Sequence, residues 1–477
     1  MANYEVVIGL EVHLQLKTKT KVFCGCSAAF GAPPNTHTCP VCLGFPGSLP
    51  VLNREALKLG AKVAMALNCR VAEEIRFDRK NYFYPDLPKD YQISQYGQPL
   101  SQRGYLLILT EGKEKRIGIT RVHLEEDTGK LLHGTGQSLI DFNRAGTPLL
   151  EIVSEPDISS PEEAYFYLTA LKSILEYIDV SDCNMEEGSL RCDANISVRK
   201  KGTKELGVKT EIKNMNSFKA VRAALEHEAA RQIETLESGG KITQETRLFD
   251  SARGVTEPMR SKEEAHDYRY FPEPDLAPFD FEKDVLRDIK REMPELPEPR
   301  RKRFMSEYKL SDYDAAVLVS DKALADYFEK CSSLYKKYKI IANWIMGDIS
   351  AYMKEHGLTI DRLNLKSEYL TGMLDMIDKG IISGKIAKTL LIDIVRTGKD
   401  PLSLVKEKGL EQITDTAQID QAVADVIKEN KRIADDFMGG KQNAVMALVG
   451  KVMAKTKGKA NPQKVIEMLK ESLKGGL

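Results

Sequence analysis

The period of the hydrophobic pattern changes near residue 292, and this change constrains the fold of the chain more than any other feature. Residues 4–16, YEVVIGLEVHLQL, alternate between apolar and polar positions, which predicts a half-buried β-strand. Its predicted buried face consists of Val6, Ile8, Leu10, Val12, Leu14 and Leu16. Strand-like segments also occupy residues 116–127, 148–157, 191–200 and 208–214. Residues 1–292 are therefore predicted to form a domain that is based on strands and has few long helices.

Two helices are expected inside this first part. Ser160 and Pro161 provide an N-cap followed by a proline at the first helical position, which predicts a helix that continues to about Tyr177. A second helix is predicted over residues 217–240, where it ends at a pair of glycines. Strands together with these flanking helices place the first part in the α+β class.

The segment REMPELPEPRRKR, residues 291–303, is rich in proline and charge and marks a domain boundary. Beyond it, apolar residues recur every three or four positions, which is the period of amphipathic helices. A second boundary is expected near residues 397–410. The predicted domains are a sheet-based domain at 1–292, an all-α domain at 293–405 and a helical tail at 406–477.

Four of the eight cysteines lie close together, in the spacing C-x-C, twelve residues, C-x-x-C. The N-terminal sequence has no charged segment followed by an apolar core, and no apolar run is long enough to span a membrane. We therefore expect a cytoplasmic protein, where clustered cysteines are more often metal ligands than disulfides. The candidate ligands of a structural zinc ion are Cys24, Cys26, Cys39 and Cys42. A redox-active pair and a stabilising disulfide remain alternatives, and His37 is an alternative ligand.

Several predicted strands carry ionisable side chains on the face opposite their apolar residues. These side chains are Glu11, His13, Glu125, Asp127, Glu151, Glu155 and Asp193. If the strands are neighbours, the carboxylates repel one another unless a cation lies among them. An oxygen-rich site with few protein ligands suits Mg²⁺ that holds nucleotide phosphates. The alternative is a solvated sheet face with salt bridges to Arg121, Arg191 and Arg199.

The common nucleotide and hydrolase motifs are absent from the sequence. It contains no P-loop, no G-x-G-x-x-G, no H-E-x-x-H and no G-x-S-x-G. If the protein binds ATP, it therefore uses a site that these common motifs do not describe.

The tail carries local positive charge although the formal net charge of the whole chain is zero. Residues 441–477 contain eight lysines and two glutamates, a net charge of +6. The tail's lysine cluster consists of Lys451, Lys455, Lys457 and Lys459. Lysines without arginines suit contact with a nucleic-acid phosphate backbone more than base reading. A solvated helical face is the alternative.

Seven longer segments, in this order along the chain, resemble the B component of the tRNA-dependent amidotransferases, the GatB family. They are VIGLEVHLQL (7–16), FDRKNYFYPDLPKDYQISQY (77–96), GITRVHLEEDTGK (118–130), NRAGTPLLEIVSEPD (143–157), MEEGSLRCDANIS (185–197), EIKNMNSF (211–218) and DYRYFPEPDL (267–276). The segment KGKANPQKV (457–465) is similar to the YqeY-like domain that ends the family's chains. The chain has no room for the large inserted domain of the related archaeal GatE.

The resemblance implies a carbon–nitrogen ligase that works with an amidase-type A subunit and a small C subunit. The A subunit releases ammonia from glutamine. The GatB chain recognises misacylated Glu-tRNA(Gln) or Asp-tRNA(Asn) and uses ATP to phosphorylate the attached side chain. Ammonia then displaces the phosphate, which gives Gln-tRNA(Gln) or Asn-tRNA(Asn). The implied cofactors are ATP, Mg²⁺ and a structural Zn²⁺, and the implied fold is a cradle on an antiparallel sheet, a helical domain and a tail.

The same resemblance assigns roles to individual residues. It implies that His13, Glu126 and Glu151 are catalytic Mg²⁺ ligands, with Glu11 and Glu125 in support. The alternation of the strand instead places Glu125, and not Glu126, on the ionisable face, so both glutamates remain candidates. The four cysteines resemble a zinc site that part of the family has, and the tail lysines become candidates for tRNA binding.

Other interpretations stay open at this point. The aromatic run Tyr82, Phe83 and Tyr84 either stacks on the tRNA acceptor end or forms a buried cluster. A non-catalytic tRNA-binding scaffold would have no ATP turnover that depends on the ionisable residues. A self-contained metal-dependent hydrolase would be active without partners.

Overall fold

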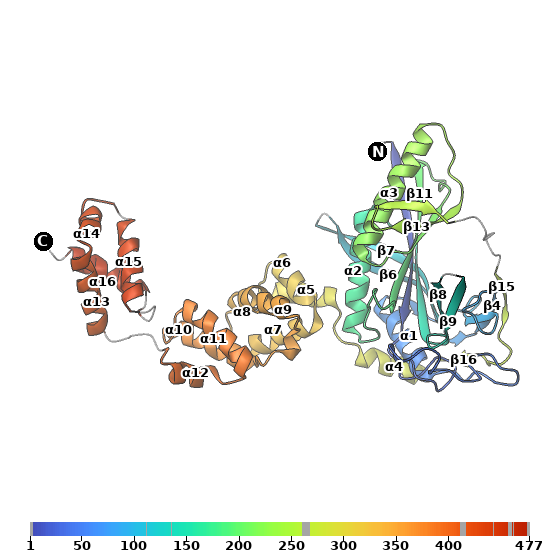
Figure 1. Ribbon diagram of the computed structural model, residues 1–477, viewed down its shortest axis with the longest axis horizontal. Coiled ribbons are helices and arrows are strands. Elements are labelled where there is room, and N and C mark those ends of the chain that lie inside the picture. The colour runs from blue at the N-terminus through green and yellow to red at the C-terminus, as the bar shows by residue number, and fades with distance from the viewer. Residues whose placement is uncertain are drawn as a thin grey trace. The chain divides into compact units, whose positions relative to one another are not determined.

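The computed structural model (Figure 1) describes residues 3–110, 112–134, 136–259, 268–410, 416–441, 443–456, 460 and 462–474. The chain divides into two compact units, residues 1–297 and residues 298–477. The division falls inside the segment 291–303, whose prolines and charges interrupt the strand pattern.

A nine-stranded sheet forms the centre of the first unit. In sheet order its strands are β14 (Val255–Pro258), β13 (Glu245–Asp250), β12 (Thr210–Lys213), β11 (Leu190–Lys200), β1 (Tyr4–Gln15), β10 (Pro148–Ser154), β7 (Lys113–Glu126), β6 (Ser101–Thr110) and β2 (Arg70–Val71). Neighbouring strands are antiparallel except for β12 and β13, which run parallel. The α+β class with a mainly antiparallel sheet is thus confirmed.

Helices cover the apolar face of this sheet. They are α1 (Arg54–Ala66), α2 (Pro161–Tyr177) and α3 (Phe218–Glu237), and α4 (Lys283–Glu292) packs against α1. Helix α2 begins as expected, because the Ser160 side chain accepts a hydrogen bond from the Glu163 backbone N–H. Helices α1, α2 and α3 pack against β7, β6 and β11, and their apolar side chains share one core with Ile8 and Val12 of β1. The odd-numbered residues of β1, among them His13, project from the opposite face.

Three small sheets complete the first unit. The first contains β15 (Arg269–Pro272), β4 (Asp78–Asn81) and β5 (Tyr91–Ser94); the second contains β3 (Glu74–Ile75) and β16 (Phe279–Asp280); the third contains β8 (Lys130–Gly134) and β9 (Gln137–Asp141). Strand β5 packs against β7 of the main sheet. The segments 77–96 and 267–276, far apart in sequence, are therefore brought together by pairing of β4 with β15.

The described part of the second unit is helical and has two separate hydrophobic cores. The first core belongs to α5 (Pro297–Glu307), α6 (Asp312–Val319), α7 (Lys322–Leu334), α8 (Tyr338–Trp344), a π-helical turn (Ile345–Ile349), α9 (Ser350–His356), a 3₁₀ turn (Ile360–Arg362), α10 (Ser367–Asp378), α11 (Gly384–Thr397) and α12 (Pro401–Lys408). The second core belongs to α13 (Thr416–Glu429), α14 (Lys431–Met438), α15 (Ala444–Lys455) and α16 (Pro462–Lys474). Among the helices that the structure describes, none is both long and apolar enough to cross a bilayer.

Candidate functional site

Strand register lines up ionisable side chains across the centre of the main sheet. His13 of β1 lies opposite Glu151 of β10, and Glu151 lies opposite His123 of β7. Residues directly opposite each other project from the same face of a sheet, so these three side chains form one row. Glu125 follows His123 by two residues and therefore projects from the same face.

The ligand atoms of His13, Glu125 and Glu151 lie within 4.8 Å of one another. The Nε2 atom of His13 is 3.6 Å from Oε2 of Glu151 and 3.9 Å from Oε1 of Glu125. The Nε2 atom of His123 is 3.3 Å from Oε2 of Glu151 and 3.7 Å from Oε2 of Glu125. Two carboxylates thus share one small volume with two imidazoles, and we call these four residues the carboxylate–histidine cluster.

The pKa values show how strongly these groups interact. Burial favours the neutral imidazole of His123, but the adjacent Glu125 and Glu151 outweigh this effect and raise its pKa to about 9. Burial likewise opposes the charged form of Glu151, yet the two histidines hold the pKa of this carboxyl well below its usual range. Without a bound cation, the two histidines therefore supply the positive charge that keeps the carboxylates ionised. Two carboxylates with an imidazole form a donor set that suits Mg²⁺ or Mn²⁺.

The structure separates the two adjacent glutamate candidates. Glu125 belongs to the cluster and accepts a hydrogen bond from the Ser94 hydroxyl at 3.2 Å. Glu126 projects to the other side of β7, where it forms an ion pair with Lys89 and accepts a hydrogen bond from the Ile93 backbone N–H at 2.9 Å. The alternation of the strand had placed Glu125 on the face of His13, and the structure agrees. The resemblance to the family had instead matched Glu126 to the Mg²⁺ ligand.

Glu11 lies next to the cluster on β1 but is not one of its close members. It is opposite Asp193 of β11, and its side chain accepts a hydrogen bond from the Asn195 amide at 3.0 Å. Burial and the nearby charges of Glu151 and Asp193 raise the pKa of Glu11 above its ordinary value. Glu11 is thus placed between the cluster and the neighbouring surface of β11.

Aromatic side chains next to the ends of β4 and β15 lie beside Lys80, whose charge interacts with Glu125 and Glu151. The Lys80 ammonium lies 4.6 Å from the ring centroid of Tyr268, and the Tyr268 ring packs edge-on against Tyr82 at 5.4 Å. Phe83 is 80% exposed, so the aromatic run 82–84 is not a buried cluster as a whole.

His123 was not among the site residues predicted from the sequence. This histidine is only 3% exposed, and its Nδ1 atom is buried without a hydrogen-bond partner. The signal was present in the sequence, because His123 precedes Glu125 by two residues within a predicted strand. The partners of a histidine inside a strand are unknown until the neighbouring strand is known. Here the neighbouring strand is β10, which places Glu151 opposite His123.

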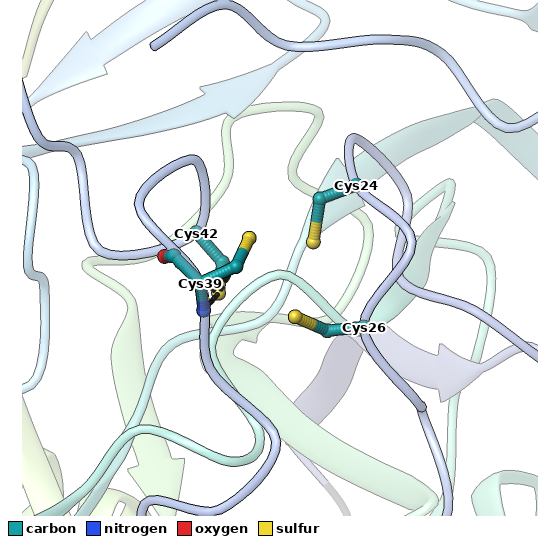
Figure 2. A group of neighbouring side chains, drawn as sticks. All are labelled: Cys24, Cys26, Cys39 and Cys42. Atoms are coloured by element: carbon teal, nitrogen blue, oxygen red, sulfur yellow. Dashed lines mark hydrogen bonds between the residues drawn. The ribbon is translucent and has the colours of Figure 1, made fainter.

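The four cysteines converge (Figure 2), with Cys24 and Cys26 on one loop and Cys39 and Cys42 on a facing loop. Their sulfur atoms lie within 4.8 Å of one another. A tetrahedral site with Zn–S bonds of ~2.3 Å needs sulfur–sulfur separations of about 3.8 Å, and the Cys39 and Cys42 sulfurs are 3.9 Å apart. The geometry therefore fits a closed four-sulfur zinc site, and His37 is not part of the group.

A buried lysine lies against this group. Lys21 is fully buried, and its ammonium donates to the His37 carbonyl at 2.7 Å, the Phe142 carbonyl at 3.3 Å and Cys42 Sγ at 3.5 Å. Within the described residues no carboxylate forms an ion pair with Lys21. A hydrogen bond from Cys24, the Cys39 backbone N–H and the Lys21 charge lower the pKa of Cys42 to about 4, although burial opposes this. Since a buried cation needs a nearby anion, Lys21 indicates that the sulfur group carries negative charge.

The structure describes two of the four tail lysines. Lys451 is an exposed residue of α15. Lys455 forms ion pairs with Asp425 at 3.1 Å and Glu429 at 2.8 Å, so it also links α15 to α13. Lys457 and Lys459 lie outside the described residues.

Comparisons with known proteins cover both units. A family model described as the GatB/GatE catalytic domain matches residues 6–287, and one described as the GatB domain matches residues 326–473. The B component of the aspartyl/glutamyl-tRNA(Asn/Gln) amidotransferase of Carboxydothermus hydrogenoformans is 56% identical over 478 residues, and that of Caldanaerobacter subterraneus is 56% identical over 472 residues, each match covering 99% of both chains. The protein with the same description from Geotalea daltonii is 53% identical over 99% of this chain and 100% of its own. The chain therefore belongs to the GatB family, the B components of the aspartyl/glutamyl-tRNA(Asn/Gln) amidotransferases.

Proposed function

We propose that the first unit uses Mg²⁺-ATP to activate the side-chain carboxylate of glutamate or aspartate attached to the wrong tRNA. The observation that carries this proposal is the meeting of His13, Glu125 and Glu151 on one sheet face, within 4.8 Å of one another. Ionised carboxylates held this close need positive charge among them, and at this site they face the aromatic side chains around Lys80.

The reaction has two balanced steps. A carboxylate oxygen of the aminoacyl side chain attacks the γ-phosphorus of ATP, which gives an acyl phosphate and ADP. Ammonia then attacks the acyl carbon, the carbon–oxygen bond to phosphate breaks, and the amide forms with inorganic phosphate as leaving group. The products are Gln-tRNA(Gln) or Asn-tRNA(Asn), so the activity is that of a carbon–nitrogen ligase.

Phosphoryl transfer depends on positioning and charge neutralisation more than on a protein nucleophile. His13, Glu125 and Glu151 would hold Mg²⁺, which when bound neutralises the charge of the phosphates. His123 contacts Glu125 and Glu151 from the buried side and fixes both carboxylates. Glu11, whose raised pKa results from burial and neighbouring acids, completes the polar surface beside them.

The proposed reaction needs a source of ammonia, and a partner protein must supply it. We propose an amidase-type A subunit that releases ammonia from glutamine, together with a small C subunit, in a heterotrimer. We also propose that the four cysteines hold a structural zinc ion, which is supported by their spacing and by the buried Lys21. The domains are proposed as a catalytic cradle at 1–292, a helical domain at 293–405 and a tRNA-binding tail at 406–477. A cytoplasmic location follows from the use of aminoacyl-tRNA.

The test is to co-purify the chain with its A and C subunits and to measure conversion of Glu-tRNA(Gln) to Gln-tRNA(Gln). We expect conversion to require ATP, Mg²⁺ and glutamine or ammonia. Conversion by the isolated chain without partners would instead indicate a self-contained enzyme. Conversion that persists when the cluster is mutated would indicate that the chain is a scaffold without chemistry of its own.

A further inference from the structure

The two cysteine loops do not expose their sulfur atoms equally. Cys24, Cys26 and Cys39 are half-buried, whereas Cys42 is only 5% exposed. A cavity of about 450 Å³ opens onto Cys24 and Cys39, and its lining includes Val51, which is 73% exposed. A small molecule in the solvent can therefore reach Cys39 through this cavity, while Cys42 is shielded behind it.

Cys39 has a neighbouring sulfur that can trap its oxidised form. Its Sγ atom is 3.9 Å from Sγ of Cys42, and its backbone N–H donates to the same Cys42 sulfur at 3.2 Å. Both residues lie on one short loop (Figure 2), in which the Leu43 N–H donates to the Cys39 carbonyl at 3.0 Å. An accessible thiolate next to a second cysteine is the arrangement typical of thiols that oxidise reversibly.

Lys21 makes the charge of the sulfurs important for the fold. This lysine is fully buried, and its ammonium donates to two backbone carbonyls and to Cys42 Sγ. Of these three acceptors only the sulfur can carry a full negative charge. Four thiolates around Zn²⁺ carry a net charge of −2, whereas a disulfide with two thiols is neutral. Oxidation would therefore leave the Lys21 ammonium buried without an anion, which destabilises a protein strongly.

We propose that the cysteine quartet is also an oxidation site for hydroperoxides, in which Cys39 reacts first, Cys42 closes the disulfide and Lys21 couples the redox state to stability. The proposal rests on the proposed zinc site for its starting state and is independent of the ligase reaction. It gives the buried lysine a role that a purely structural metal site does not require.

The reaction is balanced with hydrogen peroxide as the oxidant. The Cys39 thiolate attacks a peroxide oxygen, so a sulfur–oxygen bond forms, the oxygen–oxygen bond breaks and hydroxide leaves. The Cys42 thiolate then attacks the Cys39 sulfur, so the disulfide forms and a second hydroxide leaves. Both hydroxides take protons from solvent and become water. Cys24 and Cys26 take up one proton each when the site, now without two of its ligands, loses the metal.

Peroxide treatment of the zinc-loaded full chain tests the oxidation site. Zinc release would be followed with a chromogenic chelator, and free thiols would be alkylated before peptide mapping. Cys69 is the internal control, because burial raises the pKa of its thiol to about 11 and the neutral thiol reacts slowly. We expect one zinc ion to be released for each Cys39–Cys42 disulfide, at least ~10-fold faster than Cys69 is oxidised. Dithiothreitol with added Zn²⁺ should restore the site. Zinc release without this disulfide, or equally fast oxidation of Cys69, would overturn the assignment.

Lys21→Met tests the coupling to stability. Peroxide should lower the Tm of wild type by roughly 5 °C or more, and that of Lys21→Met by about half as much or less, because the variant has no ammonium to strand. Lys19→Met, at an exposed position of the same segment, is the matched control and should respond as wild type does. An equal loss of Tm in Lys21→Met and wild type would refute the role of Lys21.

The outcomes separate this proposal from the proposed zinc site. If freshly purified wild type contains no zinc, the zinc site fails, and mapping of the Cys39–Cys42 disulfide in the reduced, metal-free chain decides the oxidation site by itself. If zinc is present and peroxide leaves the quartet reduced, only the oxidation site fails.

Discussion

His13 and Glu151 face each other across β1 and β10, with the imidazole Nε2 3.6 Å from the carboxylate Oε2. The contact is a consequence of register, because a one-residue slip of either strand would turn one of the two side chains into the apolar core. Ile8 and Val12, which are fully buried on the other face of β1, prevent such a slip. The same burial that stabilises the sheet therefore positions His13 beside Glu151.

The structure places Glu125, and not Glu126, beside His13 and Glu151, so Glu125 is the glutamate that we propose as a cation ligand. We expect Glu125→Gln to weaken binding of Mn²⁺, used as a spectroscopic substitute for Mg²⁺, by at least ~100-fold, since even outer partners of a metal site contribute about 10–100-fold. Electron paramagnetic resonance of the purified assembly would measure free Mn²⁺. Glu126→Gln should retain Mn²⁺ binding, although it breaks the buried pair with Lys89. The reverse order of effects would show that the wrong glutamate was assigned.

The protein without a divalent cation should lose stability as the pH rises. Burial favours neutral His123, but Glu125 and Glu151 raise its pKa to about 9, so the imidazole binds its second proton more tightly in the folded state than in the unfolded state. The stability that protonated His123 contributes is fully present below the unfolded pKa of ~6.5 and is lost as the pH rises through about 9. Urea unfolding across this pH range should show the decline, and His123→Asn should flatten it. The control His356→Asn, at an exposed position of α9, should leave the slope unchanged. An identical slope in His123→Asn and wild type would refute this explanation.

Metal analysis should find one zinc ion per chain, bound by the cysteine quartet. Closed thiolate sites contribute to folding rather than to chemistry. Cys24→Ser should therefore lower Tm by roughly 5 °C or more, since 1 kcal/mol shifts the Tm of a large domain by about 2–4 °C. Catalysis by the protein that remains folded should be largely retained. Cys69→Ser, outside the quartet, is the control and should keep its zinc. Freshly purified wild-type protein without zinc would rule out the site.

Lys21→Met separates the zinc hypothesis from the disulfide alternative. If the sulfurs are thiolates, removing the buried ammonium leaves negative charge uncompensated, and zinc should be lost to a chelator more readily than from wild type. If the cysteines are paired as neutral disulfides, Lys21→Met should instead stabilise the protein. Chelator competition and thermal unfolding of the same variant would be compared.

The exposed tail lysines should contribute to tRNA affinity through phosphate contacts. Charge reversal at Lys451 and Lys455 should weaken binding and reduce the log–log salt slope by roughly one unit for each lost phosphate contact. Because Lys455 also pairs with Asp425 and Glu429, helix content must be checked by circular dichroism. Lys441→Glu, at a position paired with Asp436, is the control. A salt slope that matches wild type in the double variant would mean that these lysines form only a solvated helical face.

Much of the fold was predictable because its signals are local. The alternation of β1 identified both faces of the sheet, and the cap at Ser160 identified the start of α2. Helix α1 was not predicted, although the cap at Asn53 and the helical spacing of its buried residues were local signals in the sequence. Local periodicity could not show that β4 pairs with β15, because this contact joins segments far apart in the chain.

The same limit applies to the candidate site. Alternation within β7 correctly separated Glu125 from Glu126, because that signal needs only one strand. The membership of His123 depends on β10 lying next to β7 in one particular register, and no single strand contains that information. Lys21 was also overlooked, because a lysine beside cysteines reads as an exposed residue until its burial is known.

The most direct test is ATP turnover by the assembly with its A and C subunits in the presence of Glu-tRNA(Gln), with Glu151→Gln compared with wild type. Glu155→Gln is the matched control. Glu155 is exposed on the same segment and lies outside the cluster, and its carboxylate accepts a hydrogen bond from the Thr120 hydroxyl. Glutaminase activity, measured in parallel, reports that the assembly is intact. We predict that Glu151→Gln lowers ADP formation by at least ~100-fold while glutaminase activity is largely retained. Wild-type ADP formation by folded Glu151→Gln would contradict a catalytic role for the carboxylate–histidine cluster.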